Sequence, residues 1–256
     1  ETWERIGFCY ALASRQTDDV EDFKKLKQEA IGAYRNSAVF FEKEEGLGNQ
    51  GRSAHCSAIA DFERSWLAAN PSEKKEILDE CLKHGKKSLE AYENAGDNLN
   101  YGRTCNDVMW CLLERLYIAS DSKEMSTFAQ EGVNYANKTI EAFSKFDDKE
   151  QLLRAYGTSS LQSWYAANSS EQEERRKELA QRGLTHSEKA LMLSKEVSNP
   201  YHTAIASWAA AICTLFFTDR VESALEHAEE MWKQGTIVKD NYLKGVASYV
   251  LSFVTN

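Results

Sequence analysis

The sequence contains only two prolines and 13 glycines among its 256 residues. Both residue types interrupt helices, so a chain this poor in them can form long helices. Residues that favour helices, above all Ala, Leu, Glu, Lys and Gln, are frequent instead. Hydrophobic residues make up 42% of the chain and charged residues 28%, which is typical of a folded protein rather than a disordered one. We therefore expect an all-α protein.

The sequence also lacks a long hydrophobic segment and an excess of positive charge. Its longest apolar run, from Ala204 to Phe217, is shorter than the roughly 20 residues that a helix needs to cross a bilayer, and we expect a buried helix there. The formal net charge is −9. Binding to nucleic-acid phosphates or to an anionic membrane needs a basic surface. We expect neither partner.

The six cysteines form no C-x-x-C pair, and their spacing suggests no disulfide framework. Free cysteines among apolar residues behave as small core residues, and they are typical of a reducing compartment such as the cytoplasm. The chain begins with Glu1 and no signal-like segment follows. We therefore expect a cytoplasmic fragment of a longer protein.

Motifs of catalytic and metal sites are missing as well. The sequence contains no G-x-S-x-G and no Walker loop, and its five histidines match neither H-E-x-x-H nor a zinc spacing with cysteine. GLGNQG (46–51) matches G-x-G-x-x-G by letters, but the charged segment FEKEE precedes it where a dinucleotide site needs a strand. We expect a turn between helices there, and no cofactor, metal ion or enzymatic activity.

What the sequence does contain is a repeat with an interval of 51 residues. SAVFFEKEEGLGNQGRS (37–53), SLEAYENAGDNLNYGRT (88–104) and TIEAFSKFDDKEQLLRA (139–155) align, which places Phe41, Tyr92 and Phe143 in one column and Arg52, Arg103 and Arg154 in another. Helix-start signals, a polar residue followed three places later by Glu, recur at intervals of 52, 51, 49 and 49. These signals are Asp18/Glu21, Asn70/Glu73, Asp121/Glu124, Ser170/Glu173 and Asp219/Glu222.

Each repeat predicts two helices joined by a turn, because apolar residues recur every three or four positions on both sides of the turn. A hairpin of this kind buries its apolar face only by stacking on neighbouring copies. We therefore predict an α-solenoid of about five and a half hairpins with a period of 49–51 residues, forming one domain over 1–256. The expected first helices are 2–14, 47–69, 98–119, 149–168 (about one turn short), 200–217 and 238–254, and the second helices are 19–44, 73–95, 122–146, 171–196 and 220–234.

The segments KSLEAYENAGD, TIEAFSKFDD and ALEHAEEMWKQG resemble the second helix and exit turn of tetratricopeptide repeats. The shared feature is a small residue shortly before an aromatic one, as at Ala91 and Tyr92. The sequence departs from the family in its period, since tetratricopeptide repeats have about 34 residues, and in lacking the closing proline. It is more similar to the tetratricopeptide-like arrays of signalling ATPases and transcriptional regulators. The resemblance implies a right-handed superhelix whose concave face is lined by first helices and binds a peptide, a protein or a small effector, without catalysis.

The arginine column is the first candidate site. One interpretation is a ladder of guanidinium groups on the concave face, which could bind carboxylates or phosphates with two hydrogen bonds each. The other is a repeated salt bridge between units, for example to Glu42, Glu93 or Glu141. Asn49 and Asn100 recur together with the arginines and fit either interpretation.

Other candidates for the concave face are polar or aromatic residues of first helices. Trp66, Tyr117, Trp164 and Phe216 come late in their helices, where most aromatic residues belong to the core and a minority line a groove. The polar candidates are His55, Asn106, Tyr156, Gln162 and His202, with Tyr165 beside them.

These observations favour a non-catalytic scaffold for protein–protein interaction, which binds a protein or a peptide. The alternative is the effector-sensing module of a signalling or regulatory protein, with a small ligand in the concave face. An all-helical enzyme would need titratable groups that converge in a cleft, and no motif of the sequence predicts them.

Overall fold

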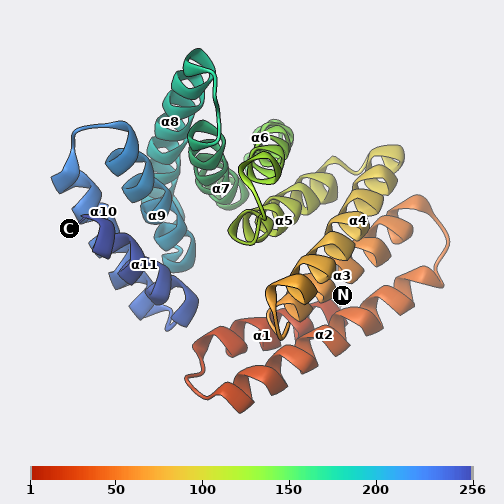
Figure 1. Ribbon diagram of the computed structural model, residues 1–256. Helices are drawn as coiled ribbons and strands as arrows, with labels where there is room; N and C mark the ends of the chain where they lie inside the picture. Colours follow the sequence, from red (N-terminus) through yellow and green to blue (C-terminus); the bar gives the residue numbers. More distant parts are fainter. Residues whose placement is uncertain (1, 255–256) are drawn as a thin grey trace. The chain divides into compact units, whose positions relative to one another are not determined.

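The computed structural model describes residues 2–254, and within them the chain forms eleven α-helices and no strand (Figure 1). The predicted all-α class is therefore confirmed, and two predicted helices, 149–168 and 200–217, have the observed bounds. The first helices of the hairpins are α1 (Thr2–Gln16), α3 (Leu47–Ser65), α5 (Asn98–Tyr117), α7 (Lys149–Asn168), α9 (Pro200–Phe217) and α11 (Asn241–Val254). The second helices are α2 (Val20–Glu42), α4 (Pro71–Ala95), α6 (Ser122–Ser144), α8 (Glu173–Val197) and α10 (Val221–Ile237).

The repeat is stricter in the structure than in the prediction. First helices begin at residues 47, 98, 149 and 200, and second helices at 20, 71, 122 and 173, so both series advance by 51 residues. The regularity ends after α9, since α10 begins at residue 221, 48 after α8, and α11 at residue 241, 41 after α9. The predicted shortening of α7 is wrong, because α5 and α7 both have 20 residues.

Two of the predicted capping boxes form. The side chains of Asn70 and Asp121 accept hydrogen bonds from the backbone N–H groups of Glu73 and Glu124, at 3.0 and 2.8 Å. In return, the Glu73 carboxylate accepts a bond from the N–H of Ala69. These side chains satisfy N–H groups that a helix start leaves without a partner inside the helix.

The other three capping boxes are wrong by one or two residues. Asp19, not Asp18, is the N-cap of α2, and its side chain accepts from the N–H of Asp22. The helices α8 and α10 begin after Gln172 and Arg220, and neither residue makes a side-chain cap bond. The two intervals of 49 residues came from these misplaced caps.

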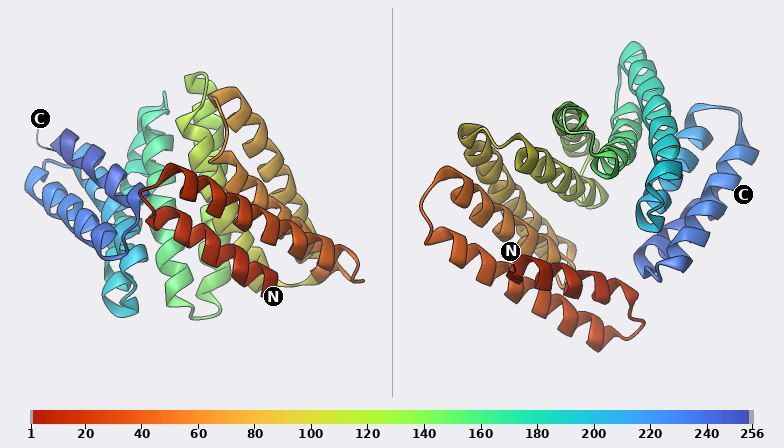
Figure 2. Two further views of the ribbon diagram at one scale, coloured as in Figure 1. Left: turned by 90° about the horizontal axis from the view of Figure 1, so that it is seen from below. Right: turned by 180° about the vertical axis from the view of Figure 1, so that it is seen from behind.

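The chain divides into two compact units, Glu1–Ile118 and Ala119–Asn256. In each unit every helix packs mainly against the helices before and after it in the chain (Figures 1 and 2). First helices of consecutive hairpins also meet, α3 with α5 in the first unit, and α9 with both α7 and α11 in the second. This is the packing of an α-solenoid. The single domain and the right-handed superhelical path stay predictions.

The column of Phe41, Tyr92 and Phe143 is buried, as the repeat predicts. Phe41 packs against Cys56 of α3, the first helix of the next hairpin, which is the expected contact. Tyr92 also packs within its own hairpin, because a Cβ atom at Gly51 of α3 would lie 2.8 Å from its ring. Residues of this column therefore pack both between consecutive hairpins and within one hairpin, whereas we expected only the contact between hairpins.

The apolar run in α9 is a buried helix, as predicted. All residues from Ala204 to Thr214 are buried. Across residues 2–254, no helix combines the length and the apolar character that crossing a membrane requires.

Candidate functional site

Arg52 of α3 binds Glu4 of α1 through two hydrogen bonds, Nε to Oε1 at 2.8 Å and Nη2 to Oε2 at 2.5 Å. The guanidinium also lies 4.5 Å from the centroid of the Phe41 ring. Burial raises the pKa of the Glu4 carboxyl, but hydrogen bonds from Arg52 and Cys56 and the charge of Arg52 outweigh it, so the pKa lies below its ordinary value. For Arg52 the structure shows a salt bridge between hairpins, with Glu4 as the partner instead of Glu42.

The other two arginines of the column have different surroundings. Arg103 is exposed and makes no ion pair within residues 2–254. Arg154 is half-buried, and its charge lowers the pKa of the nearby His202. Glu141, one of the expected partners, pairs with Lys145 on its own helix at 3.1 Å. Because Arg103 makes no ion pair in the described chain, the salt bridge of Arg52 is not repeated at every position of the column, and the three guanidinium groups are not equivalent.

Two further polar contacts join consecutive first helices. His55 of α3 lies 2.8 Å from Asp107 of α5, and His202 of α9 lies 3.1 Å from Glu150 of α7. Burial and the charge of Arg154 lower the pKa of His202 to about 4 despite the neighbouring Glu150 carboxylate. His202 is therefore a neutral imidazole at neutral pH. Like Arg52, both histidines hold neighbouring hairpins together.

Asn49 and Asn100 are involved in local hydrogen bonds at the starts of their helices. The Asn49 side chain donates to the carbonyl of Glu45 at 2.9 Å, and that of Asn100 donates to the carboxylate of Asp97 at 2.7 Å. Both side chains therefore act within their own helix starts and not between hairpins.

Three other predicted site residues lie in or against the core. Asn106 and Gln162 are completely buried, so neither reaches a surface that a partner could touch. A Cβ atom at Gly132 of α6 would lie 2.4 Å from Gln162, which places the Gln162 side chain between α6 and α7. Tyr156 packs against α8, where its ring lies 5.2 Å from that of His186. The prediction had placed these three residues in the concave face.

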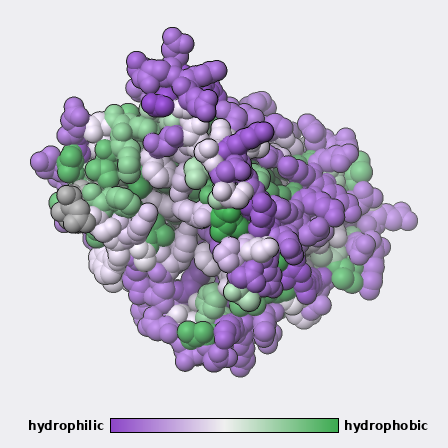
Figure 3. All heavy atoms as spheres, viewed as in Figure 1, coloured by the Kyte–Doolittle hydropathy of each residue, from purple (hydrophilic) through white to green (hydrophobic). Residues whose placement is uncertain are grey.

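Aromatic side chains of three first helices in the second unit form a continuous row, which we call the aromatic row. Its members are Trp164 of α7, Phe216 of α9, and Phe253 and Tyr249 of α11. The ring centroids lie 5.3 Å apart for Trp164 and Phe216, 6.4 Å for Phe216 and Phe253, and 4.8 Å for Tyr249 and Phe253. Phe216, Tyr249 and Phe253 are 46%, 63% and 47% exposed. Figure 3 shows hydrophobic side chains gathered on the left side of the molecule, where the C-terminal helices lie in Figure 1.

Trp66, one of the four aromatic residues that come late in first helices, lies outside the aromatic row. Its ring is contacted by two lysines, with Lys27 Nζ at 5.6 Å and Lys74 Nζ at 4.9 Å from the ring. Lys27 forms an ion pair with Glu63, and both side chains are almost completely buried. Lys74 pairs with the buried Glu114 at 2.7 Å. These lysines connect second helices to the first helices that follow, and the sequence analysis did not identify them.

Ser159 of α7 and His186 of α8 form a hydrogen bond of 2.7 Å between Oγ and Nδ1. Such a pair resembles a nucleophile with its base. Burial, together with the charges of Arg182 and Lys189, lowers the pKa of His186 to about 4. Ser159 is completely buried, so a substrate could not reach its hydroxyl without an opening of the core. We interpret the pair as a structural bond between the two helices.

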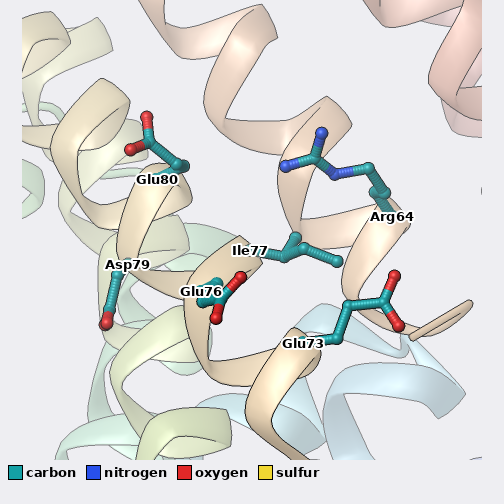
Figure 4. Close-up of a pocket in the computed structure, with 6 residues that line it drawn as sticks. All are labelled: Arg64, Glu73, Glu76, Ile77, Asp79 and Glu80. Carbon is teal, nitrogen blue, oxygen red and sulfur yellow. The ribbon is translucent and has the colours of Figure 1, made fainter. Parts of the chain in front are cut away.

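A hollow of about 580 Å³ lies between the end of α3 and the start of α4 (Figure 4). Arg64 and Ile77 line it together with four carboxylates, those of Glu73, Glu76, Asp79 and Glu80. Two of its groups are already bound, since Arg64 pairs with Asp61 and Asp79 with Arg115. In residues 2–254, no three His, Cys, Asp or Glu side chains are arranged to hold a metal ion.

No protein family model matches the chain, and no curated protein matches its sequence. Among solved structures it is similar to the de novo designed helical repeat protein DHR64, at 16% identity and a TM-score of 0.36, with 87% of this chain and 97% of that chain covered. It is also similar to the DHF58 filament, at 15% identity and a TM-score of 0.37, with 86% and 96% covered. A protein from the computational design of self-assembling cyclic homooligomers follows at 11% identity and a TM-score of 0.26, with 99% and 94% covered.

Proposed function

We propose that this protein is a non-catalytic scaffold that binds a peptide or protein segment on the aromatic row. The observation that carries the proposal is the exposure of Phe216, Tyr249 and Phe253 on neighbouring first helices. Aromatic rings bury a large area when they are covered, and they are enriched in the residues that dominate binding energy. A continuous row of rings therefore fits an extended ligand that contacts α9 and α11 together.

Three polar candidates of the first helices already pair with carboxylates of the protein, and this favours a binding surface that is mainly aromatic. Arg52, His55 and His202 are engaged with carboxylates of the neighbouring first helix. A ligand that needed these groups would have to break the contacts between hairpins. The exposed rings need no such change, because they lose only water when a ligand covers them.

The finer classification belongs to the same proposal. A tetratricopeptide-like array, of the kind found in signalling proteins, is supported by the first helices that meet in consecutive hairpins and by glycines that lie under tyrosine rings, Gly7 under Tyr34 and Gly51 under Tyr92. Five of the six cysteines are buried thiols, which supports a reducing compartment such as the cytoplasm.

A selection from a displayed peptide library tests the proposal. The wild-type chain serves as bait, and each enriched peptide is then titrated against a Phe216→Ser/Phe253→Ser variant. Met192→Ser is the matched control, because Met192 is 64% exposed but lies on the second helix α8. We expect the double variant to bind at least tenfold more weakly, and the control to bind like the wild type.

Two results would contradict the proposal. One is a library from which the wild-type chain enriches no peptide. The other is a set of enriched peptides that bind the double variant as tightly as the wild type. Circular dichroism of each variant shows whether the helices remain folded, so that a loss of binding can be assigned to the surface.

A further inference from the structure

Three cations lie along one side of α8. Arg175, Arg182 and Lys189 follow one another at intervals of seven residues. Seven residues are close to two turns of an α-helix, so the three side chains leave α8 in nearly the same direction. Together they extend over about 21 Å of the helix. We call these three residues the cationic stripe.

Arg182, the central cation of the stripe, makes no ion pair within residues 2–254 although it is half-buried. Its Nη2 atom donates to two neutral oxygens, the Val133 carbonyl at 3.3 Å and the Ser159 hydroxyl at 3.4 Å. Its Nε atom is buried and has no hydrogen-bond partner in these residues. Burial and the charge of Arg175 lower the pKa of the Arg182 guanidinium, and the charge of Glu178 offsets this only in part. A cation that has lost water without gaining a carboxylate is costly, so an anion brought to this place would stabilise it.

The two outer cations of the stripe are also little neutralised. Lys189 is exposed, its Nζ atom lies 5.2 Å from the centre of the Tyr156 ring, and it forms no ion pair in the part of the chain that the structure describes. Arg175 pairs with Glu178 on its own helix at 2.6 Å, but the Glu178 side chain is 67% exposed. Exposed pairs of this kind contribute little. The stripe is therefore a local region of positive charge on an acidic protein.

The second helix α4 carries the opposite charge at the same stage of the repeat. Glu73 and Glu80 are the third and tenth residues of α4, where Arg175 and Arg182 are the third and tenth residues of α8. The acidic face of α4, as we call it, consists of these two glutamates together with Glu76 and Asp79. All four acidic side chains are exposed, and they border the hollow in Figure 4. Two helices of one chain thus present opposite charges with the same spacing.

We propose that the cationic stripe of α8 binds the acidic face of α4 in a second copy of the chain. That face supplies what the stripe lacks, carboxylates at a matching distance along a helix. The match holds whether the two helices run parallel or antiparallel, because the charges on both are seven residues apart.

The charge of the whole chain favours this contact over others between copies. At a net charge of −9, two copies repel each other on average, so they can associate only where a region of opposite charge meets the acidic surface. A single small anion would fit the stripe less well, since it would leave most of the roughly 21 Å unmatched. The contact joins two different faces, and it can therefore produce a closed pair or a longer chain of copies.

The proposal goes beyond the proposed function, because it concerns another helix and another partner. Sedimentation equilibrium of the full chain measures the association, at about 50 mM salt and again at about 0.5 M salt, where exposed charges are screened. We expect the wild-type chain to associate at low salt and to associate at least tenfold more weakly at high salt.

Two variants each remove one of the faces. Glu76→Lys/Glu80→Lys changes the acidic face, and Arg175→Glu/Lys189→Glu changes the cationic stripe but leaves Arg182 and its hydrogen bonds in place. Each variant alone should associate at least tenfold more weakly than the wild type. An equimolar mixture of the two should associate again, because one variant keeps the stripe and the other keeps the acidic face.

Lys177→Glu/Lys195→Glu is the matched control for the change in charge. Both lysines are exposed on α8, and they lie on another side of the helix than the stripe, five turns from each other. This variant should associate like the wild type. Phe216→Ser/Phe253→Ser should do so as well, which separates this proposal from the proposed function.

Four results would overturn the proposal. The wild-type chain could stay monomeric at low salt, both face variants could associate like the wild type, or their mixture could associate no better than its components. The fourth is an association that Phe216→Ser/Phe253→Ser abolishes, since the aromatic row would then hold the copies together. Circular dichroism checks the fold of each variant, and Arg175→Gln/Lys189→Gln replaces the glutamate variant, with the same expectation, if that variant does not fold.

Discussion

The ring of Tyr92 lies directly on the backbone of α3 at Gly51, in a space that no side chain at position 51 could share. Tyr92 is 2% exposed, so α4 and α3 are held together through a buried aromatic contact. The burial also raises the pKa of the Tyr92 hydroxyl, above all by removing it from water. The hydroxyl is therefore un-ionised at every pH at which the protein is studied.

Replacement of this ring should open a cavity between the two helices. We expect Tyr92→Ala to lower the free energy of unfolding by about 3 kcal/mol, as for other large-to-small changes in protein cores. Urea unfolding followed by circular dichroism measures the change. Tyr249→Ala is the control, because Tyr249 is 63% exposed and its loss should change stability by less than about 0.5 kcal/mol. Equal stability of Tyr92→Ala and the wild type would show that the ring does not stabilise the packing of α4 on α3.

The buried pair of Lys27 and Glu63 should respond differently to single and double changes. Lys27→Met leaves the Glu63 carboxylate buried without its lysine, and we expect it to lower the free energy of unfolding by about 3–5 kcal/mol. Lys27→Met/Glu63→Leu removes both charges and should regain most of that loss. A double variant less stable than Lys27→Met would contradict the expectation, and urea unfolding of the three chains decides it.

The two arginines Arg52 and Arg103 offer a matched comparison within one column. Arg52→Gln breaks the pair with Glu4 and should lower the free energy of unfolding by about 1 kcal/mol, because the pair is partly exposed to water. Arg103→Gln removes an exposed arginine and should change stability little. The pKa of Glu4 in the folded chain is below its ordinary value of 4.5. The effect of Arg52→Gln should therefore be complete above pH 4.5 and shrink as the pH falls through the lower, folded value. A stability difference that is the same at pH 7 and pH 3 would argue against the ion pair as its source.

His186 should make the chain less stable in mild acid. Its pKa is about 4 in the folded chain and 6.5 as the ordinary value. As the pH falls from 6.5 to 4, the unfolded chain therefore binds a proton that the folded chain does not, and unfolding becomes more favourable. In His186→Gln this contribution is missing, so its stability should fall less between pH 7 and pH 5. Thr185→Gln leaves the imidazole in place and should keep the wild-type slope. If the stability of His186→Gln fell with pH as steeply as that of the wild type, His186 would not be the source of the loss of stability in acid.

The sequence predicted the helices well because their signals are local. The spacing of apolar residues and the caps at Asn70 and Asp121 lie within single helices and turns, where helix formation is decided. The caps at Ser170 and Asp219 were misplaced because α8 and α10 begin after Gln172 and Arg220, which make no side-chain cap bond and are not among the residue types that usually cap a helix.

The partners of the candidate residues were harder to predict because they depend on contacts between helices. The place 51 residues after Glu4 is occupied by His55, so the arginine column has no matching column of acids. Glu63 and Glu114 are 51 residues apart and both bind a buried or half-buried lysine, so these acidic partners repeat at the same interval as the arginines. Gln162 looked like a surface residue because polarity says nothing about burial between two helices.

The common interval of the helix starts has a consequence for changes in the length of the chain. Removal of residues 47–97 would delete one whole hairpin and join the end of the α2 segment to α5, which begins at the same stage of the repeat as α3. Arg103 would then follow Glu4 at the distance in sequence that now separates Glu4 from Arg52. Insertions or losses of 51 residues are thus the changes that this chain can absorb most easily, whereas a loss of 50 would rotate every later helix face by about 100°.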